Sequence, residues 1–265
     1  MPHLMELKSG LFSSNLIEQA PIALLKPFSA LTPSGSSSDD RAEFNSEIKR
    51  VTAALCQATA DFLRENKSNA VSEYKKAIEH SNAAIRLAQQ IELGKKAEAA
   101  SASLYYCRGI VALILIKIGD GSADLNKAVA DLAKSAKLNP VAETYLRLGE
   151  AHAYAGNLDA AVESLEKATD LDSYCAEAFL LKGLVHQARG DEDEYYDDIY
   201  EAIMLNPDLY REEFEPIMED AREWEEKWDK TLKSPESIAM LQAWAEKAKK
   251  ERRAEEAEPP ISKDG

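Results

Sequence analysis

Two histidines stand at equivalent places of a sequence repeat, His152 and His186, 34 residues apart. Imidazole nitrogens are common ligands of Zn²⁺, and equivalent side chains on successive repeats could approach one ion. A structural zinc site takes four protein ligands, however, and the sequence offers no evident source for the third and the fourth. We therefore expect no metal site at these histidines.

The acidic run DEDEYYDD, which begins at Asp191, is a second candidate for metal binding. A calcium loop places carboxylates at alternate positions and a glycine at its sharp turn, and the run lacks both features. Carboxylates are favourable at the beginning of a helix in any case, because they oppose the positive end of the helix dipole. We interpret the run as a solvated turn that leads into a helix.

Three cysteines, Cys56, Cys107 and Cys175, are widely separated and odd in number, which indicates free thiols rather than a disulfide framework. No set of residues combines a nucleophile, a base and an orienting group in a definable geometry. There is also no glycine-rich loop of the kind that binds phosphates or dinucleotides. The sequence thus predicts a protein that is not an enzyme and needs no metal or cofactor.

The charge balance limits the class of partner. With 47 acidic and 32 basic residues the formal net charge is −15, which disfavours nucleic acid and favours a protein with basic residues. The first residues, MPHLMELKSG, do not form a secretory signal. The longest uncharged apolar run, Ile110–Ile116, is much shorter than the roughly 20 residues that span a bilayer. We expect no membrane span and a cytoplasmic protein.

The helices that would position these residues follow from an internal repeat. The segment AETYLRLGEAHAYAGNLDAAVESLEKATDLDS, from Ala142, aligns with AEAFLLKGLVHQARGDEDEYYDDIYEAIMLNP, from Ala176. Gly149 then matches Gly183, at the same spacing of 34 residues. Small residues and aromatics that recur at such a period are typical of paired antiparallel helices that stack into a solenoid.

This pattern resembles the tetratricopeptide repeat family. The resemblance implies an all-α solenoid of about four helix pairs, followed by C-terminal capping helices. It also implies that His152 and His186 fill positions where the family places a packing aromatic. The domains we predict are an arm with an apolar segment, the repeats, capping helices and a disordered tail, at residues 1–40, 41–207, 208–253 and 254–265.

Some local features are less regular. Ser68 is a candidate N-cap for the second helix, and Gly94 is a candidate stop after it. Tyr195 stands where Ala161 stands one repeat earlier, which predicts a loosely packed or shifted last helix. The apolar stretch at residues 11–31 either docks on the folded body or serves as a motif for another protein.

In the family the first helix of each pair lines a concave groove. Co-chaperone members use lysines, asparagines and an arginine there to clamp a carboxylate. Arg147 matches the arginine, but Glu143 stands where a lysine belongs and Cys107 where an asparagine belongs. By resemblance, the groove residues are Tyr106, Ile110, Leu113, Leu146, Arg147, Glu150, Tyr154, Leu180, Leu181, Leu184 and Gln187.

These residues describe an apolar trough flanked by Glu143, Glu150 and Glu177. Such a surface suits an amphipathic helix, or an extended apolar segment with basic flanks. The sequence therefore predicts a non-enzymatic adaptor that binds a peptide or a helix of a partner protein. The alternative is a structural subunit or self-associating scaffold that uses its C-terminal helices. The oligomeric state stays open.

Overall fold

The computed structural model describes residues 38–90 and 94–232, and these ranges contain helices and no strand. The all-α prediction is confirmed. The apolar stretch at residues 11–31 and the predicted tail lie outside the described residues. The helices of the repeat region are α3 (Ser38–Leu63), α4 (Lys67–Gln90), α5 (Gly94–Lys117), α6 (Leu125–Leu138), α7 (Ala142–Ala155), α8 (Leu158–Leu171), α9 (Ala176–Arg189) and α10 (Glu192–Leu205).

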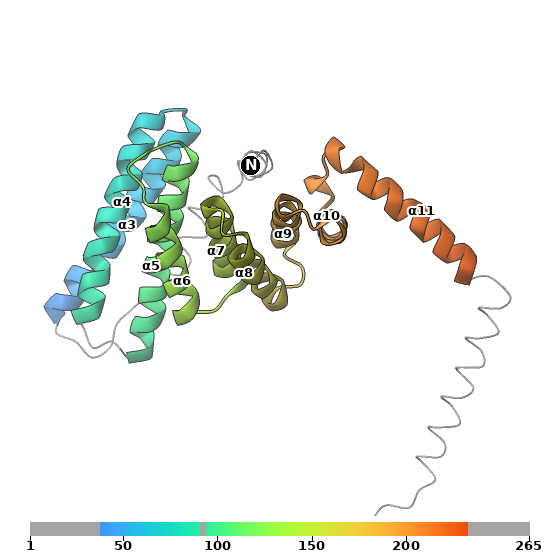
Figure 1. The fold of residues 1–265 in the computed structure, drawn as a ribbon. Helices are drawn as coiled ribbons and strands as arrows, with labels where there is room; N and C mark the ends of the chain where they lie inside the picture. Colours follow the sequence, from blue (N-terminus) through green and yellow to red (C-terminus); the bar gives the residue numbers. More distant parts are fainter. Residues whose placement is uncertain (1–37, 91–93, 233–265) are drawn as a thin grey trace, which may run out of the picture. The chain divides into compact units, whose positions relative to one another are not determined.

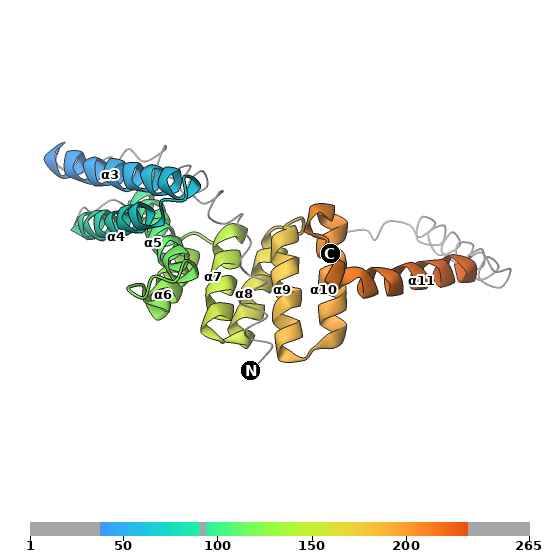
Figure 2. The same ribbon diagram turned by 90° about the horizontal axis from the view of Figure 1, so that it is seen from above.

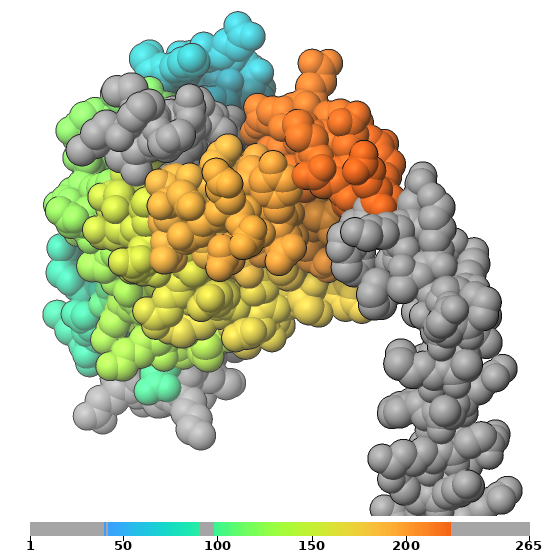
Figure 3. Space-filling view, turned by 45° about the vertical axis from the view of Figure 1, so that its right-hand side comes forward, coloured from blue at the N-terminus to red at the C-terminus, as the bar shows by residue number. Residues whose placement is uncertain are grey.

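Consecutive helices pack as four pairs, α3 with α4, α5 with α6, α7 with α8, and α9 with α10 (Figure 1). Each pair also contacts the next one, through α4 and α5, α6 and α7, and α8 and α9. The first helices of the last three pairs touch directly, α5 with α7 and α7 with α9 (Figure 2). In Figure 3 the pairs α7/α8 and α9/α10 form one continuous surface. The predicted solenoid of four helix pairs is confirmed.

The last two pairs keep the same register. The bounds of α9 and α10 are those of α7 and α8 displaced by 34 residues. Gly156 and Gly190 follow the first helix of each pair in the left-handed conformation, with φ of 77° and 87°, which ends both helices at the same place. Tyr195 is half-buried where Ala161 is fully buried, yet α10 is not shifted, since Ile199 is buried as Leu165 is.

The small residues of the repeat lie where two helices approach closely. A methyl group on Gly149 would stand 2.6 Å from Cγ of Leu165, and one on Gly109 would stand 2.8 Å from Cγ of Leu132. Real β-carbons do not approach other atoms so closely. Glycine at this position therefore lets the two helices of a pair pack against each other.

Two predicted helix boundaries are wrong. Asn66, rather than Ser68, caps α4, because its Oδ1 accepts a hydrogen bond from the Asn69 N–H at 3.4 Å. Asparagine and serine cap helices about equally well, so the turn that precedes α4 decides between them. Gly94 stands at the beginning of α5 and does not follow the end of α4 at Gln90.

Helix α5 contains a segment, Glu98–Lys117, that is long and apolar enough to cross a membrane by length and composition. Most of this segment is buried inside the protein, with Leu104 and Ile114 fully covered. Arg108 in its middle pairs with Asp131 of α6. The core helix of a solenoid passes the same test, so the segment is weak evidence for a membrane span.

The chain divides into two compact units between Tyr210 and Arg211. The second unit begins with a short 3₁₀ helix, η3 (Glu212–Phe214), and continues in α11 (Glu215–Leu232). Pro216 occupies the first turn of α11, where its missing N–H costs no hydrogen bond. The side chains after Glu223, on which the scaffold alternative mainly depends, lie outside the described residues.

Candidate protein-binding face

The groove positions predicted by resemblance come from α5, α7 and α9, the first helices of the last three pairs. We call this surface the first-helix face. The four leucines expected to line it, Leu146, Leu180, Leu181 and Leu184, are at most 7% exposed, so they belong to the core. Tyr106, Ile110, Leu113, Arg147, Glu150 and Tyr154 are buried as well, and Gln187 is exposed.

Arg147 is the hub of an ion-pair cluster on this face. Its Nη1 and Nη2 donate to the two carboxylate oxygens of Glu177 in α9, at 2.9 and 3.2 Å. Its Nε donates to Glu143 Oε1, one turn earlier in α7, at 2.8 Å. A two-bond fork of this kind fixes geometry as well as charge. Arg147 therefore holds two carboxylates of neighbouring repeats at fixed positions.

The same cluster reaches α5. Lys117 Nζ pairs with Glu150, whose other oxygen lies 3.4 Å from Arg147 Nη1. The hydroxyl of Tyr106 donates to Glu143 Oε1 at 3.0 Å. Three first helices are thus joined by one network. We call it the Arg147 cluster: Tyr106, Lys117, Glu143, Arg147, Glu150 and Glu177.

The charged groups of the cluster differ in exposure. The side chains of Lys117, Arg147 and Glu150 are 3, 6 and 5% exposed, whereas those of Glu143 and Glu177 are 45 and 39% exposed. Burial alone would lower the pKa of Arg147, but Glu177, Glu143 and Glu150 raise it well above its usual value. The cluster therefore presents carboxylates outward and keeps its cations inside.

This arrangement leaves Arg147 engaged with carboxylates of the chain itself. The one arginine that matches the family's clamp already pairs with three glutamates. The contact between Glu143 and Arg147 was predictable from the sequence, since residues four apart meet on one face of a helix. The contact between Arg147 and Glu177, 30 residues later, could not be predicted from their spacing, because the two residues lie on different helices.

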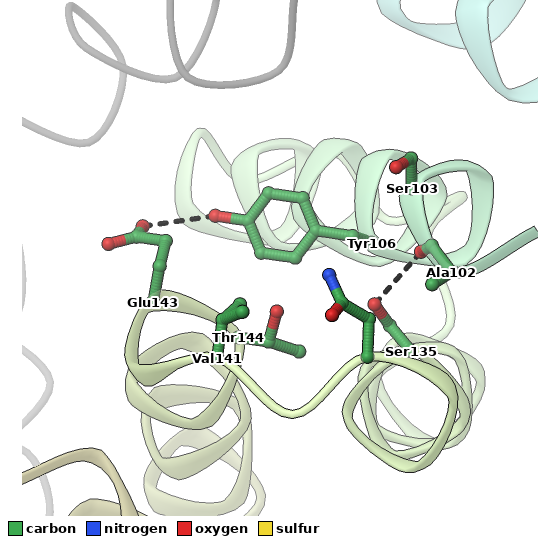
Figure 4. Close-up of a pocket in the computed structure, with 8 residues that line it drawn as sticks. Ala102, Ser103, Tyr106, Ser135, Val141, Glu143 and Thr144 are labelled. Atoms are coloured by element: carbon green, nitrogen blue, oxygen red, sulfur yellow. Dashed lines mark hydrogen bonds between the residues drawn. The ribbon is translucent and has the colours of Figure 1, made fainter. Parts of the chain in front are cut away.

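A small cavity opens beside the cluster, between α5, α6 and the beginning of α7 (Figure 4). Its volume is ≈ 170 Å³. Figure 4 shows Glu143 at one end of the cavity, bonded to Tyr106 across it. The lining residues are Ala102, Ser103, Tyr106, Ser135, Asn139, Val141, Glu143 and Thr144. Tyr106 and Glu143 could be predicted from the sequence as residues of this face, but the cavity could not, because its wall comes from three helices.

The two repeat histidines have separate surroundings. His186 Nδ1 lies 3.2 Å from Asp191 Oδ2, and its Nε2 lies 3.7 Å from Asp198 Oδ2. His152 Nδ1 is buried and has no hydrogen-bond partner within the described part of the chain. Among residues 38–90 and 94–232 no group of three or more His, Cys, Asp or Glu side chains could hold a metal ion.

Burial lowers the pKa of His152 below its ordinary 6.5, and the carboxylate of Glu163 opposes this only in part. A lowered pKa in the folded state means that the unfolded chain binds the proton more readily as the pH falls below 6.5. We therefore expect the free energy of unfolding to decrease as the pH falls below 6.5. The decrease should be smaller in the His152→Phe variant. Urea unfolding of both proteins at neutral and mildly acidic pH checks this, and equal pH dependence would contradict it.

Comparison with known proteins agrees with the repeat seen in the helices. The model of the tetratricopeptide repeat family matches residues 142–175, which are α7, α8 and the turn that follows. No curated protein matches the sequence.

Solved structures with similar folds include the MamA protein, which is 20% identical, with 60% of this chain and 93% of that chain covered and a TM-score of 0.36. YrrB, described as a TPR protein with an unusual peptide-binding site, is 22% identical over 62% of this chain and 89% of its own, with a TM-score of 0.37. TTC0263, a thermophilic TPR protein in Thermus thermophilus, is 18% identical over 62% of this chain and 94% of its own, with a TM-score of 0.37. At these scores the likenesses add nothing about a ligand.

The family match covers one helix pair, and the next pair repeats its bounds at the same period. The pairs before and after it carry glycines that meet the partner helix as Gly149 does. Within its described residues the chain is therefore an all-α solenoid of four helix pairs, and residues 142–175 of it match the tetratricopeptide repeat family.

Proposed function

We propose that the protein is a non-enzymatic adaptor that binds a peptide or an amphipathic helix of a partner protein on its first-helix face. The tetratricopeptide fold supports a role as a protein-interaction adaptor or scaffold. The observation that carries the finer proposal is the pair of half-exposed carboxylates, Glu143 and Glu177, which Arg147 holds side by side on adjacent repeats.

Fixed carboxylates favour a partner segment with basic residues. Arg147 is already bonded to both of them, so an incoming lysine or arginine would meet oriented acceptors whose geometry is set before binding. Complementary charge of this kind raises the association rate and rejects acidic competitors. The partner we propose is therefore a protein segment with at least one exposed lysine or arginine.

We propose that this interaction takes place in the cytoplasm. Cys56, Cys107 and Cys175 are all free thiols. Unpaired cysteines are typical of a reducing compartment.

The test compares two double variants that remove the same charge. Peptides that bind the full-length chain are first selected from a random library displayed on phage, and their dissociation constants are measured by fluorescence polarisation. Glu143→Gln with Glu177→Gln is expected to weaken binding about tenfold, which is roughly 1.4 kcal/mol. Glutamine keeps the size and the acceptor oxygen, so Arg147 retains partners.

The matched control is Glu166→Gln with Glu201→Gln, two exposed glutamates on the second helices α8 and α10. This control is expected to bind like the natural chain. Equal weakening by both pairs would show a general charge effect and contradict the first-helix face as the site. Glutamates introduced at Leu146 and Leu181 are unsuitable as a test, since both leucines are buried and the variant would unfold.

A further inference from the structure

We infer that the cavity between α5, α6 and α7 is an anchor pocket that takes one apolar side chain of the partner segment, next to a lysine or arginine of the same segment. This inference rests on the proposed function. It adds a specificity-determining subsite whose residues Val141, Thr144 and Ser135 are not among the groove positions that the family resemblance supplies.

The size of the cavity fits one side chain. Its ≈ 170 Å³ is close to the roughly 150 Å³ of an engineered apolar cavity that binds benzene. Pockets for drug-sized ligands are larger, from about 300 Å³ upward. A leucine, isoleucine, methionine or phenylalanine side chain is therefore the occupant that the volume favours.

Several polar atoms at the wall are already engaged in hydrogen bonds. The hydroxyl of Ser135 donates to the backbone oxygen of Ala102 at 2.8 Å, and that of Ser103 donates to the backbone oxygen of Ala99 at 3.0 Å. The hydroxyl of Tyr106 donates a hydrogen bond to Glu143, so the aromatic ring is the part of Tyr106 that lines the cavity. Within the described residues the side chains of Asn139 and Thr144 make no hydrogen bond, so a polar guest would find these two partners besides Glu143. Any polar group of the guest that misses them would be buried unpaired, which is costly. An apolar guest is favoured.

The border of the cavity supplies the charge. Glu143 accepts hydrogen bonds from Tyr106 and Arg147, and both go to its Oε1. Within the described residues no hydrogen bond reaches Oε2, and the side chain is 45% exposed. A carboxylate has about four acceptor sites, so Oε2 can accept from a cation. A lysine or arginine close to the apolar anchor would make a charge-assisted bond there.

Val141 offers a way to close the pocket without disturbing the cluster. It is 41% exposed and lines the cavity as the N-cap residue of α7. Its backbone is extended, at φ −129°, and its side chain makes no capping hydrogen bond. A larger residue is compatible with this conformation, and its bulk would reach the cavity.

The experiment uses peptides selected on the full-length chain from the random phage-displayed library. They are expected to share one large apolar residue within about two positions of a lysine or arginine. Val141→Trp is expected to weaken their binding at least tenfold. Leu63→Trp, which places the same residue at an exposed apolar position at the end of α3, is expected to leave binding unchanged. Thermal unfolding of both variants shows that each is folded.

The outcomes separate the two proposals. If the glutamine pair at Glu143 and Glu177 weakens binding but Val141→Trp does not, the anchor pocket is wrong and the first-helix face stands. If neither change weakens binding, or the library yields no peptide that binds the chain, both are wrong. Selected peptides without a large apolar residue would also overturn the pocket.

Discussion

Replacing Arg147 with methionine is expected to lower the free energy of unfolding by about 3 kcal/mol, because it removes the buried cation that three carboxylates share. Loss of one partner from a buried ion pair costs about 3 to 5 kcal/mol. The lower end applies, since Glu143 and Glu177 are half-exposed and can return to water. Urea denaturation followed by circular dichroism measures the change.

The matched control is Arg189→Met. Arg189 also pairs with carboxylates, Asp191 at 2.9 Å and Asp159 at 3.6 Å, but its side chain is 32% exposed. Exposed ion pairs are worth about 0 to 1 kcal/mol, so this change is expected to cost no more than that. Equal losses at the two arginines would mean that the Arg147 cluster does not join the repeats.

A second large effect is expected where the helices of the third pair touch. Leu165 is fully buried, and Leu165→Ala is expected to cost about 3 kcal/mol. Gly149→Ala places a methyl 2.6 Å from Leu165 Cγ, and we expect it to destabilise the natural chain by about 1 to 2 kcal/mol. Urea unfolding of both single variants and the double variant measures the coupling.

The change in the free energy of unfolding caused by Gly149→Ala should reverse its sign when Leu165 is also replaced by alanine. Without the leucine side chain the nearest atom to the new methyl is the backbone oxygen of Ala161 at 3.3 Å, which needs to shift by only a few tenths of an ångström. Alanine is preferred over glycine inside a helix by about 1 kcal/mol, which exceeds the cost we expect for that shift. Gly149→Ala is therefore expected to stabilise the Leu165→Ala protein. Gly121→Ala, where an added methyl meets nothing within 4 Å, is the control and should change stability little. Additive effects at Gly149 and Leu165 would contradict the close packing.

The fold was predictable where several residues of the repeat agree. The close approach of the two helices of a pair is marked by Gly149, and the end of the first helix is marked by Gly156. Both glycines recur 34 positions later, so the sequence predicted both the repeat period and the pairing of the helices. The boundary between α3 and α4 depended on one residue, and Asn66 and Ser68 have similar capping preference. The capping preference of the residue type therefore could not decide which of the two begins α4.

The candidate site was predictable only within one helix. Glu143 and Arg147 stand one turn apart, and this spacing indicates contact. Glu177 and Lys117 join the cluster from α9 and α5, so their roles depend on how the pairs stack. The burial of the groove leucines depends on tertiary packing in the same way. Residue types alone suggested an apolar trough, whereas the described surface there is a carboxylate pair beside a small cavity.

We propose that partner proteins bind the first-helix face. The most direct test places a photoreactive phenylalanine analogue at Gln187, the exposed position of that face in α9, and compares it with the same analogue at Glu166 in α8. After irradiation in the native cell, we expect a discrete cross-linked protein from position 187 and none from position 166. A cross-linked partner at position 166 but not at position 187 would mean that partners bind the second helices and not the first-helix face.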